Sequence, residues 1–189
     1  MNKRKNTEYD IQESILGMRL SDRILFDRRT ICMFSMICSE TAEMLIKDLL
    51  ALDKVKKAPI YLHINSPGGE LSQGLAIIDT MRGLRSPITT IITGEACSMA
   101  TFVALYGKHR LMTSNSFWMG HEMQHDVSDY YTKTKYRFEY QEGLWIKLRD
   151  VYRNRTKLTP EDINVIEKGE LWLDANQCLK KGIVDKVLG

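Results

Sequence analysis

The sequence predicts an α/β protein with a mostly parallel sheet. Short apolar segments of strand length alternate along the chain with longer segments whose apolar residues recur at helical spacing. Such alternation builds β–α–β units, which place helices against a parallel sheet through right-handed crossovers. The 189 residues, 43% of them hydrophobic, suffice for one domain with a sizeable core. We therefore expect a single α/β domain with a short N-terminal extension.

The first half of the chain predicts three strands, each followed by a helix. Residues 11–27 have roughly helical apolar spacing, so we expect an N-terminal tail and helix over 1–28 and the main domain over 29–189. The elements expected next are a buried strand at 30–37, a helix from Ser39 as its N-cap, a strand at 60–64, a helix carrying Leu75, Ile78 and Met81, a strand at 88–93, a turn at 94–98 and a buried helix at 99–106.

The second half predicts shorter elements around one long amphipathic helix, expected from about 129 to 155. Thr159 followed by Pro160 is typical of a helix start, and Gly169 ends that helix. The remaining expected elements are strands at 109–113 and 116–120, a helix opened by Asp174 and Gln177 and ended by Gly182, and a last strand at 183–188.

Composition excludes several classes of protein. The formal net charge is +3, from 27 basic and 24 acidic residues spread along the chain, which does not indicate a nucleic-acid partner. No apolar run approaches the ~20 residues of a membrane-spanning helix, and the polar first ten residues lack a signal-peptide core. The four cysteines contain no CxxC pair and indicate neither disulfides nor a zinc cage. We expect a cytoplasmic protein without a membrane partner.

Two turns between an expected strand and an expected helix carry candidate chemistry, because ligands gather at such junctions in α/β sheets. The first, residues 65–69, has the sequence Asn-Ser-Pro-Gly-Gly. A glycine pair there lets backbone N–H groups face a substrate as oxyanion donors. The alternative is an ordinary tight turn.

The second turn, residues 94–100, places Ser98 among small residues, as a nucleophile elbow does. The glycine and alanines leave space for the serine hydroxyl to project into a cleft. The alternative interpretation is a serine that caps the following helix.

A nucleophilic serine needs a base, and the chain has four histidines: His63, His109, His121 and His125. His63 lies within a strand and His109 in a basic turn. His121 follows a strand end, as Ser98 does, so the two side chains could converge. The alternative is a strand-end histidine bonded to the backbone.

Residues 121–125 also spell the HExxH signature of zinc peptidases, in which His121 and His125 would bind zinc and Glu122 would act as general base. That chemistry requires both histidines on one face of a helix. The local sequence favours a strand ending at Gly120 followed by a loop, which argues against the zinc interpretation.

Three motifs in a fixed order resemble the Clp-type serine peptidases, the proteolytic subunits of Clp proteases. They are Asn-Ser-Pro-Gly-Gly, then Gly-x-Ala-x-Ser-Met, then Asn-Ser with four residues before His121, and the likeness extends from about Arg29 to Leu188. The resemblance implies that Ser98 is the nucleophile and His121 the general base. It also implies that the backbone N–H groups of Gly69 and Met99 form the oxyanion hole.

The resemblance implies an acidic third member of the triad, located by counting back from the final Gly-Ile-Val-Asp segment. That position is Glu170, directly before Leu171. Glutamate can orient an imidazole as aspartate does, with a longer reach. Asp174 is the fallback, although it is better explained as a helix N-cap, and Asp126 and Asp129 are weaker candidates.

The fold implied by the resemblance is crotonase-like, made of stacked ββα units with the helix at about 129–155 as a protruding handle. It also implies heptameric rings that enclose the active sites, fed by an unfoldase ATPase. The chain departs from the family pattern at residues 123–126, at Gly169, at His63 and at Ala100. Because the first two departures affect ring contacts, we expect a single ring or an altered ring–ring contact.

The sequence as a whole therefore predicts a serine endopeptidase that hydrolyses peptides and unfolded proteins through an acyl-enzyme on Ser98, in a ring-shaped homo-oligomer, without a metal or organic cofactor. Three alternatives stay open. They are a zinc metallopeptidase using His121, Glu122 and His125, a crotonase-type acyl-CoA enzyme, and a catalytically silent ring subunit. The length and the lack of an evident CoA-binding surface disfavour the second, and the presence of Ser98 with His121 disfavours the third.

Overall fold

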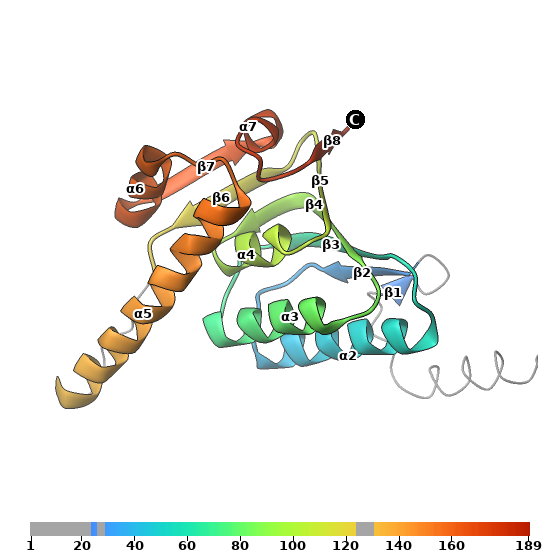
Figure 1. Ribbon diagram of the computed structural model, residues 1–189, viewed down its shortest axis with the longest axis horizontal. Helices are drawn as coiled ribbons and strands as arrows, with labels where there is room; N and C mark the ends of the chain where they lie inside the picture. The colour runs from blue at the N-terminus through green and yellow to red at the C-terminus, as the bar shows by residue number, and fades with distance from the viewer. Residues whose placement is uncertain (1–23, 26–28, 124–130) are drawn as a thin grey trace, which may run out of the picture.

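The computed structural model describes residues 24–25, 29–123 and 131–189. Eight strands in these ranges form one sheet: β1 Ile24–Leu25, β2 Thr30–Met33, β3 Ile60–Ser66, β4 Ile88–Cys97, β5 His109–Thr113, β6 Phe117–His121, β7 Glu170–Asp174 and β8 Lys186–Leu188. The helices of the described part are α2 Ser39–Val55, α3 Leu71–Gly83, α4 Met99–Leu105, α5 Tyr131–Arg155, α6 Pro160–Lys168 and α7 Ala175–Lys180. Figure 1 shows α2 and α3 side by side along the sheet, and α5 extending away from it.

The sheet is mostly parallel, as the alternation of strands and helices predicts. The strand order is β1-β2-β3-β4-β5-β8, and β6 leaves this path by pairing with β4 and β7. The antiparallel pairs are β1 with β2 and β6 with β7. The sheet therefore has a branch at β4, whose first half pairs with β5 and whose second half pairs with β6.

Gly94 lies at the branch point of β4. Its φ of +108° and a shift in the β3–β4 register at this level mark a bulge. The Asn65 side chain accepts a hydrogen bond from the Glu95 N–H (3.1 Å), and the Ser116 hydroxyl accepts one from the Gly94 N–H (2.8 Å). Because these side chains satisfy the bulged backbone, β4 continues to Cys97, and the turn expected over 94–98 is wrong.

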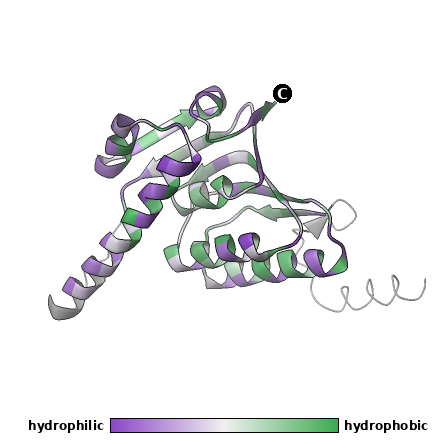
Figure 2. Ribbon diagram, in the orientation of Figure 1, coloured by the Kyte–Doolittle hydropathy of each residue, from purple (hydrophilic) through white to green (hydrophobic). Residues whose placement is uncertain are grey.

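The core lies between the sheet and the helices that cover it. Its largest members with almost no exposed surface are Ile31, Ile37, Leu45, Leu49, Leu52, Ile60, Leu62, Ile64, Ile77, Ile92, Trp118 and Tyr152. In Figure 2 the hydrophobic colour lies on the strands and on α2, α3 and α4, whereas α5 and α6 carry long hydrophilic stretches. The apolar segments at strand spacing thus form the buried layer that the sequence predicts.

The starts of α6 and α7 follow the predicted capping chemistry, whereas the N-cap of α2 lies one residue before the predicted cap. Thr159 accepts a hydrogen bond from the Asp162 N–H (3.2 Å) at the start of α6, and Asp174 accepts one from the Gln177 N–H (2.8 Å) at the start of α7. The N-cap of α2 is Cys38 and not Ser39, because the Thr41 hydroxyl accepts from the Cys38 N–H (3.0 Å).

Several expected elements differ in extent. Ile24–Leu25 form strand β1 where a helix was expected, while the rest of 1–28 lies outside the described residues, so the division at residue 28 stays a prediction. Strand β2 ends at Met33 and β8 begins at Lys186, so both are shorter than expected. Strand β7 was not expected. The long helix is confirmed from Tyr131 to Arg155, and residues 129–130 lie outside the described part.

No helix in the part of the chain that the structure describes is long and apolar enough to cross a membrane.

Candidate active site

Ser98 occupies a strained turn between β4 and α4. Its backbone has φ 52° and ψ −126°, and only one other non-glycine residue of the described ranges, Arg29, has a positive φ. Such a conformation costs of order 1–3 kcal/mol and persists only where the surrounding structure imposes it. The Ser98 N–H donates to the carbonyl oxygen of Met119 (2.9 Å), so β6 holds the turn in place. This strained turn between a strand and a helix has the backbone form of a nucleophile elbow, which is the form that the small residues around Ser98 predict.

The glycine turn lies directly against this elbow. A Cβ on Gly68 would be 2.7 Å from the Ser98 Cβ and 2.9 Å from the Met99 amide nitrogen, so any side chain there would collide with the elbow. The turn is held by a bridge to Ile37, whose N–H donates to the Gly68 carbonyl (2.7 Å) and whose carbonyl accepts from the Glu70 N–H (2.8 Å). The close approach explains why this turn contains a glycine pair.

Two backbone N–H groups beside Ser98 have no acceptor in the part of the chain that the structure describes. Within the described residues, the amides of Gly69 and Met99 donate to no other group. The bridge to Ile37 uses the Gly68 carbonyl and the Glu70 amide, so the Gly69 amide between them is left unpaired. Met99 is the first residue of α4, and the first amides of a helix have no partner within the helix. Both residues line the same cleft as Ser98, so their N–H groups are available to an oxyanion there.

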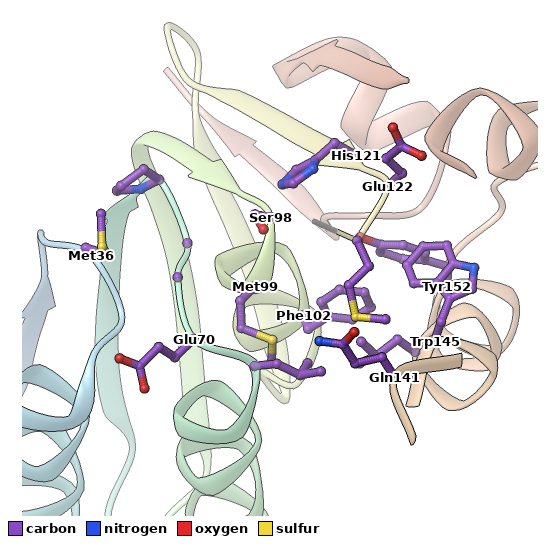
Figure 3. Close-up of a pocket in the computed structure, with 16 residues that line it drawn as sticks. Met36, Glu70, Ser98, Met99, Phe102, His121, Glu122, Gln141, Trp145 and Tyr152 are labelled. Atoms are coloured by element: carbon purple, nitrogen blue, oxygen red, sulfur yellow. The ribbon is translucent and has the colours of Figure 1, made fainter. Parts of the chain in front are cut away.

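His121 and Ser98 line one cleft of about 610 Å³. Figure 3 shows both side chains at this cleft, with Met36 and Glu70 at one end and Trp145 and Gln141 at the other. His121 is the last residue of β6, and Ser98 follows the end of β4, which pairs with β6 in parallel. The predicted convergence is thus present, although no hydrogen bond joins the two side chains among the residues that the structure describes.

Glu170 lies directly opposite His121 in the antiparallel β6–β7 pair. Directly opposite residues share a face of the sheet, with Cβ atoms about 5 Å apart, so the carboxylate can reach the imidazole. In this structure the Glu170 carboxylate instead accepts a hydrogen bond from the Trp172 indole N–H (2.8 Å). Asp174 pairs with Phe117 four residues along the strand and caps α7, and Asp126 and Asp129 lie outside the described residues.

The far wall of the cleft is apolar and comes mainly from α4 and α5. It is formed by Met99, Phe102, Trp145, Leu148 and Tyr152. The rings of Phe102 and Tyr152 stack with centroids 4.5 Å apart. The sequence marks the helix-spaced Trp145, Leu148 and Tyr152 as one stripe of α5, but only the fold shows that the stripe reaches Ser98.

Cys97, the residue before Ser98, does not compete as a nucleophile. Burial raises the pKa of the Cys97 thiol to about 12, with smaller contributions from Glu95 and Glu170. The thiol therefore stays protonated, and a protonated thiol is a poor nucleophile.

The structure around His121 argues against the zinc interpretation. His121 belongs to a strand, whereas HExxH chemistry needs both histidines one turn apart on a helix, and His125 lies outside the described residues. Across the described ranges, no three His, Cys, Asp or Glu side chains group closely enough to hold a metal ion.

Comparison with known proteins identifies the family. The family model for Clp protease matches residues 17–189. The chain belongs to the Clp protease family. It is 31% identical to the ATP-dependent Clp protease proteolytic subunit of Streptococcus mutans, with 94% of each chain covered. It is 30% identical to the subunit of the same name from Lactococcus lactis subsp. cremoris, with 94% of this chain and 93% of the relative covered.

Membership of the Clp protease family makes the chain a serine-type peptidase and confirms the fold class that the resemblance implies. The mixed α/β fold with a largely parallel sheet is consistent with that family. An acyl-CoA enzyme of the crotonase type is therefore no longer a competing interpretation.

Proposed function

We propose that this Clp protease family member cleaves peptide bonds through an acyl-enzyme on Ser98, with His121 as the general base. The observation that carries the proposal is the strained Ser98 elbow, which shares one cleft with His121 and with the unpaired amides of Gly69 and Met99. A strained serine between two unused N–H donors and a histidine is the arrangement that acyl transfer requires.

The proposed chemistry has two halves. In the first, the Ser98 Oγ attacks the substrate carbonyl while His121 takes its proton, and the Gly69 and Met99 N–H groups bind the oxyanion. The C–N bond then breaks, and His121 protonates the leaving amine. In the second half, water attacks the acyl-enzyme with His121 again as the base, which releases the acid and restores the Ser98 hydroxyl.

Glu170 is the proposed third member of the triad. Its position opposite His121 on β7 supports this role, and the Asp174 carboxylate is already engaged in capping α7. To orient the imidazole, Glu170 exchanges the Trp172 indole for His121 as its hydrogen-bond partner. A carboxylate in this place selects the productive tautomer and stabilises the imidazolium.

The proposed substrates are peptides and unfolded proteins, which enter the cleft as extended chains. The apolar wall of Phe102, Trp145 and Leu148 suits a bulky apolar side chain next to the cleaved bond. The relatives are named as subunits of ATP-dependent proteases, which supports a Clp ATPase as partner and a cytoplasmic location.

A ring-shaped homo-oligomer is the proposed assembly. Large apolar side chains on α5 are exposed in the single chain, among them Tyr136 (67%), Tyr140 (66%) and Ile146 (46%). Residues of this kind on a projecting helix are typical of a surface that a second subunit covers.

The decisive experiment is active-site labelling with a fluorophosphonate probe during a peptidase assay. We expect the probe to attach to Ser98 and to abolish hydrolysis, and we expect Ser98→Ala to lose both labelling and activity. Hydrolysis that persists in Ser98→Ala but is lost to a chelator and restored by zinc would contradict the proposal. A folded chain with neither labelling nor hydrolysis would identify a catalytically silent subunit.

A further inference from the structure

Thr101, in the first turn of α4, bonds the carbonyl oxygen of Ser98 twice. Its hydroxyl is 2.6 Å from that oxygen and its backbone N–H 3.0 Å. The Thr101 side chain has no exposed surface, so water does not compete for these bonds. The Ser98 carbonyl is therefore held from one side by a single buried residue.

Tyr152 of α5 extends this contact. Its hydroxyl oxygen is 2.9 Å from the Thr101 Oγ1, and the direction of the bond follows from the donors available. A carbonyl oxygen can only accept a hydrogen bond, so the Thr101 hydroxyl donates its hydrogen to the Ser98 oxygen. The Tyr152 hydroxyl must then be the donor in its bond to the Thr101 hydroxyl. The three groups form one chain of hydrogen bonds, from the Tyr152 O–H through the Thr101 O–H to the Ser98 C=O.

The tyrosine end of the chain is fixed by packing. The Tyr152 ring stacks on Phe102 with centroids 4.5 Å apart and meets the Trp118 ring edge-on at 5.7 Å. The side chain is 1% exposed, and burial raises the pKa of its hydroxyl above the ordinary range, so Tyr152 stays a proton donor. The hydroxyl therefore has a fixed position relative to α4.

The bonded carbonyl belongs to the same peptide group as the Met99 N–H. In a planar trans peptide, the C=O and N–H bonds point in opposite directions. Fixing the Ser98 oxygen therefore fixes the direction of the Met99 N–H on the other side of the peptide plane. Hydrogen bonding to the oxygen also polarises the N–H and makes it a better donor.

We propose that Thr101 and Tyr152 are positioning residues that aim the Met99 N–H at the substrate oxyanion. The inference rests on the proposed function, since it assigns a role within the same site. Neither side chain reacts with the substrate; both act through the peptide group between Ser98 and Met99. The pair places a residue of the projecting helix in control of one oxyanion donor.

The test removes the two hydroxyls separately and measures kcat and KM for a fluorogenic peptide. In Tyr152→Phe and Thr101→Val we expect kcat to fall about tenfold with KM changed less than about twofold, because an oxyanion donor acts in the transition state and not on bound substrate. Thr101→Ser keeps the hydroxyl and should keep kcat near that of the wild type. Tyr61→Phe, which removes an exposed hydroxyl from β3, is the matched control.

A second readout separates positioning from a structural role. A peptide boronate, which forms a tetrahedral adduct with an active-site serine, should lose affinity in Tyr152→Phe by the same factor as kcat/KM. A variant with a lower melting temperature but unchanged kcat and boronate affinity would overturn the inference. Failure of the proposed function is a different outcome, since it would leave wild-type Ser98 unlabelled by the fluorophosphonate probe.

Discussion

At the scale of single residues, the site depends on one backbone conformation. Ser98 adopts φ 52° and ψ −126°, which glycine tolerates and other residues do not favour. Contacts from three directions hold this conformation: the Met119 carbonyl accepts from its N–H, Gly68 lies against its Cβ, and Thr101 bonds its carbonyl. The serine is thus held in position at a cost in stability.

That cost is measurable by comparing two substitutions of Ser98. We expect Ser98→Gly to have a free energy of unfolding about 1 kcal/mol higher than that of Ser98→Ala, because only glycine adopts this backbone conformation without strain. The greater conformational freedom of glycine in the unfolded chain offsets part of this stabilisation. Thermal unfolding followed by circular dichroism should show a midpoint about 2–4 °C higher for Ser98→Gly. Equal or reversed midpoints would mean that the turn is not strained.

The proposed third triad member is tested by two substitutions on β7 that replace a carboxylate with an uncharged amide. We expect Glu170→Gln to keep the fold and to lower kcat by roughly two to four orders of magnitude, because the imidazole loses its charged partner and preferred tautomer. Asp174→Asn should keep activity and lose about 1 kcal/mol or less through a weaker cap on α7. Steady-state kinetics and melting curves on both variants distinguish the roles. Full activity of Glu170→Gln together with an inactive, equally stable Asp174→Asn would reverse the assignment.

The residues predicted from sequence are those whose signals are local. Ser98 lies in a run of small residues at a strand-to-helix junction, and the glycine pair precedes another such helix, so both motifs are visible in a few letters. The Thr101–Tyr152 bond joins residues 51 apart, and the Glu170–Trp172 bond needs a strand that was not expected. Contacts between distant segments depend on packing, which no local pattern encodes.

At the scale of elements, hydrogen bonds join the C-terminal end of α2 to the loop before β4. The Asp53 carboxylate accepts from the Ser86 N–H (2.7 Å) and from the Arg85 guanidinium (3.3 Å). The Arg29 guanidinium donates nearby to the Leu52 carbonyl (2.9 Å) and to the Ser86 hydroxyl (3.2 Å). These bonds hold α2 against the start of β4, the strand that leads to Ser98.

The hydrogen bonds to the Asp53 carboxylate predict that the stability of the fold depends on pH. Hydrogen bonds from Ser86 and then Arg85 lower the pKa of Asp53 from 3.8 to about 2. Because the pKa is lower in the folded state, the stabilisation is complete above the ordinary value and is lost as the pH falls toward about 2. We expect Asp53→Asn to be less stable than wild type at pH 7 and to converge with it in strong acid, as measured by urea unfolding. Asp79→Asn, which loses only an exposed ion pair with Arg82, is the control. A stability difference that does not change with pH would contradict the assignment.

The sequence predicts an element well where its apolar spacing and its capping or turn residues indicate the same structure. Where these two patterns indicate different structures, the prediction is wrong. The caps of α6 and α7 match because apolar spacing and capping residues agree there. Strand β7 was missed because the capping role of Asp174 dominates its short sequence. The turn expected around Gly94 is a bulge, because the Asn65 and Ser116 side chains, which are distant in sequence, satisfy its backbone.

At the scale of the whole molecule, α5 has two different halves. Leu148 and Tyr152, in its C-terminal part, are buried against the cleft, whereas Tyr136, Tyr140 and Ile146 are exposed. Figure 1 shows the other end of α5 projecting from the body. The apolar stripe predicted for this helix is thus only partly covered by the chain itself. The rest is available to other copies of the chain.

The assembly is tested by light scattering on the purified protein at micromolar concentration. We expect an oligomer, because the exposed side chains of α5 would otherwise face water. The resemblance to Clp-type peptidases implies a mass of seven copies of the 21.9 kDa chain, or of twice that number. The departures at residues 123–126 and at Gly169 favour a single ring or an altered ring–ring contact. Full peptidase activity from a stable monomer would refute the ring proposal.

The branch at β4 makes the two parts of the sheet one cooperative unit. Because β4 is bonded to β3 along one edge and to β5 and β6 along the other, neither part can open without breaking bonds to this strand. In native-state hydrogen exchange, the amides of Ile91 and Ile92 should therefore exchange only through global unfolding, while those near Tyr136 exchange through local fraying of α5. Ser98 comes directly after this strand, so opening of the projecting helix end would leave the proposed nucleophile in place.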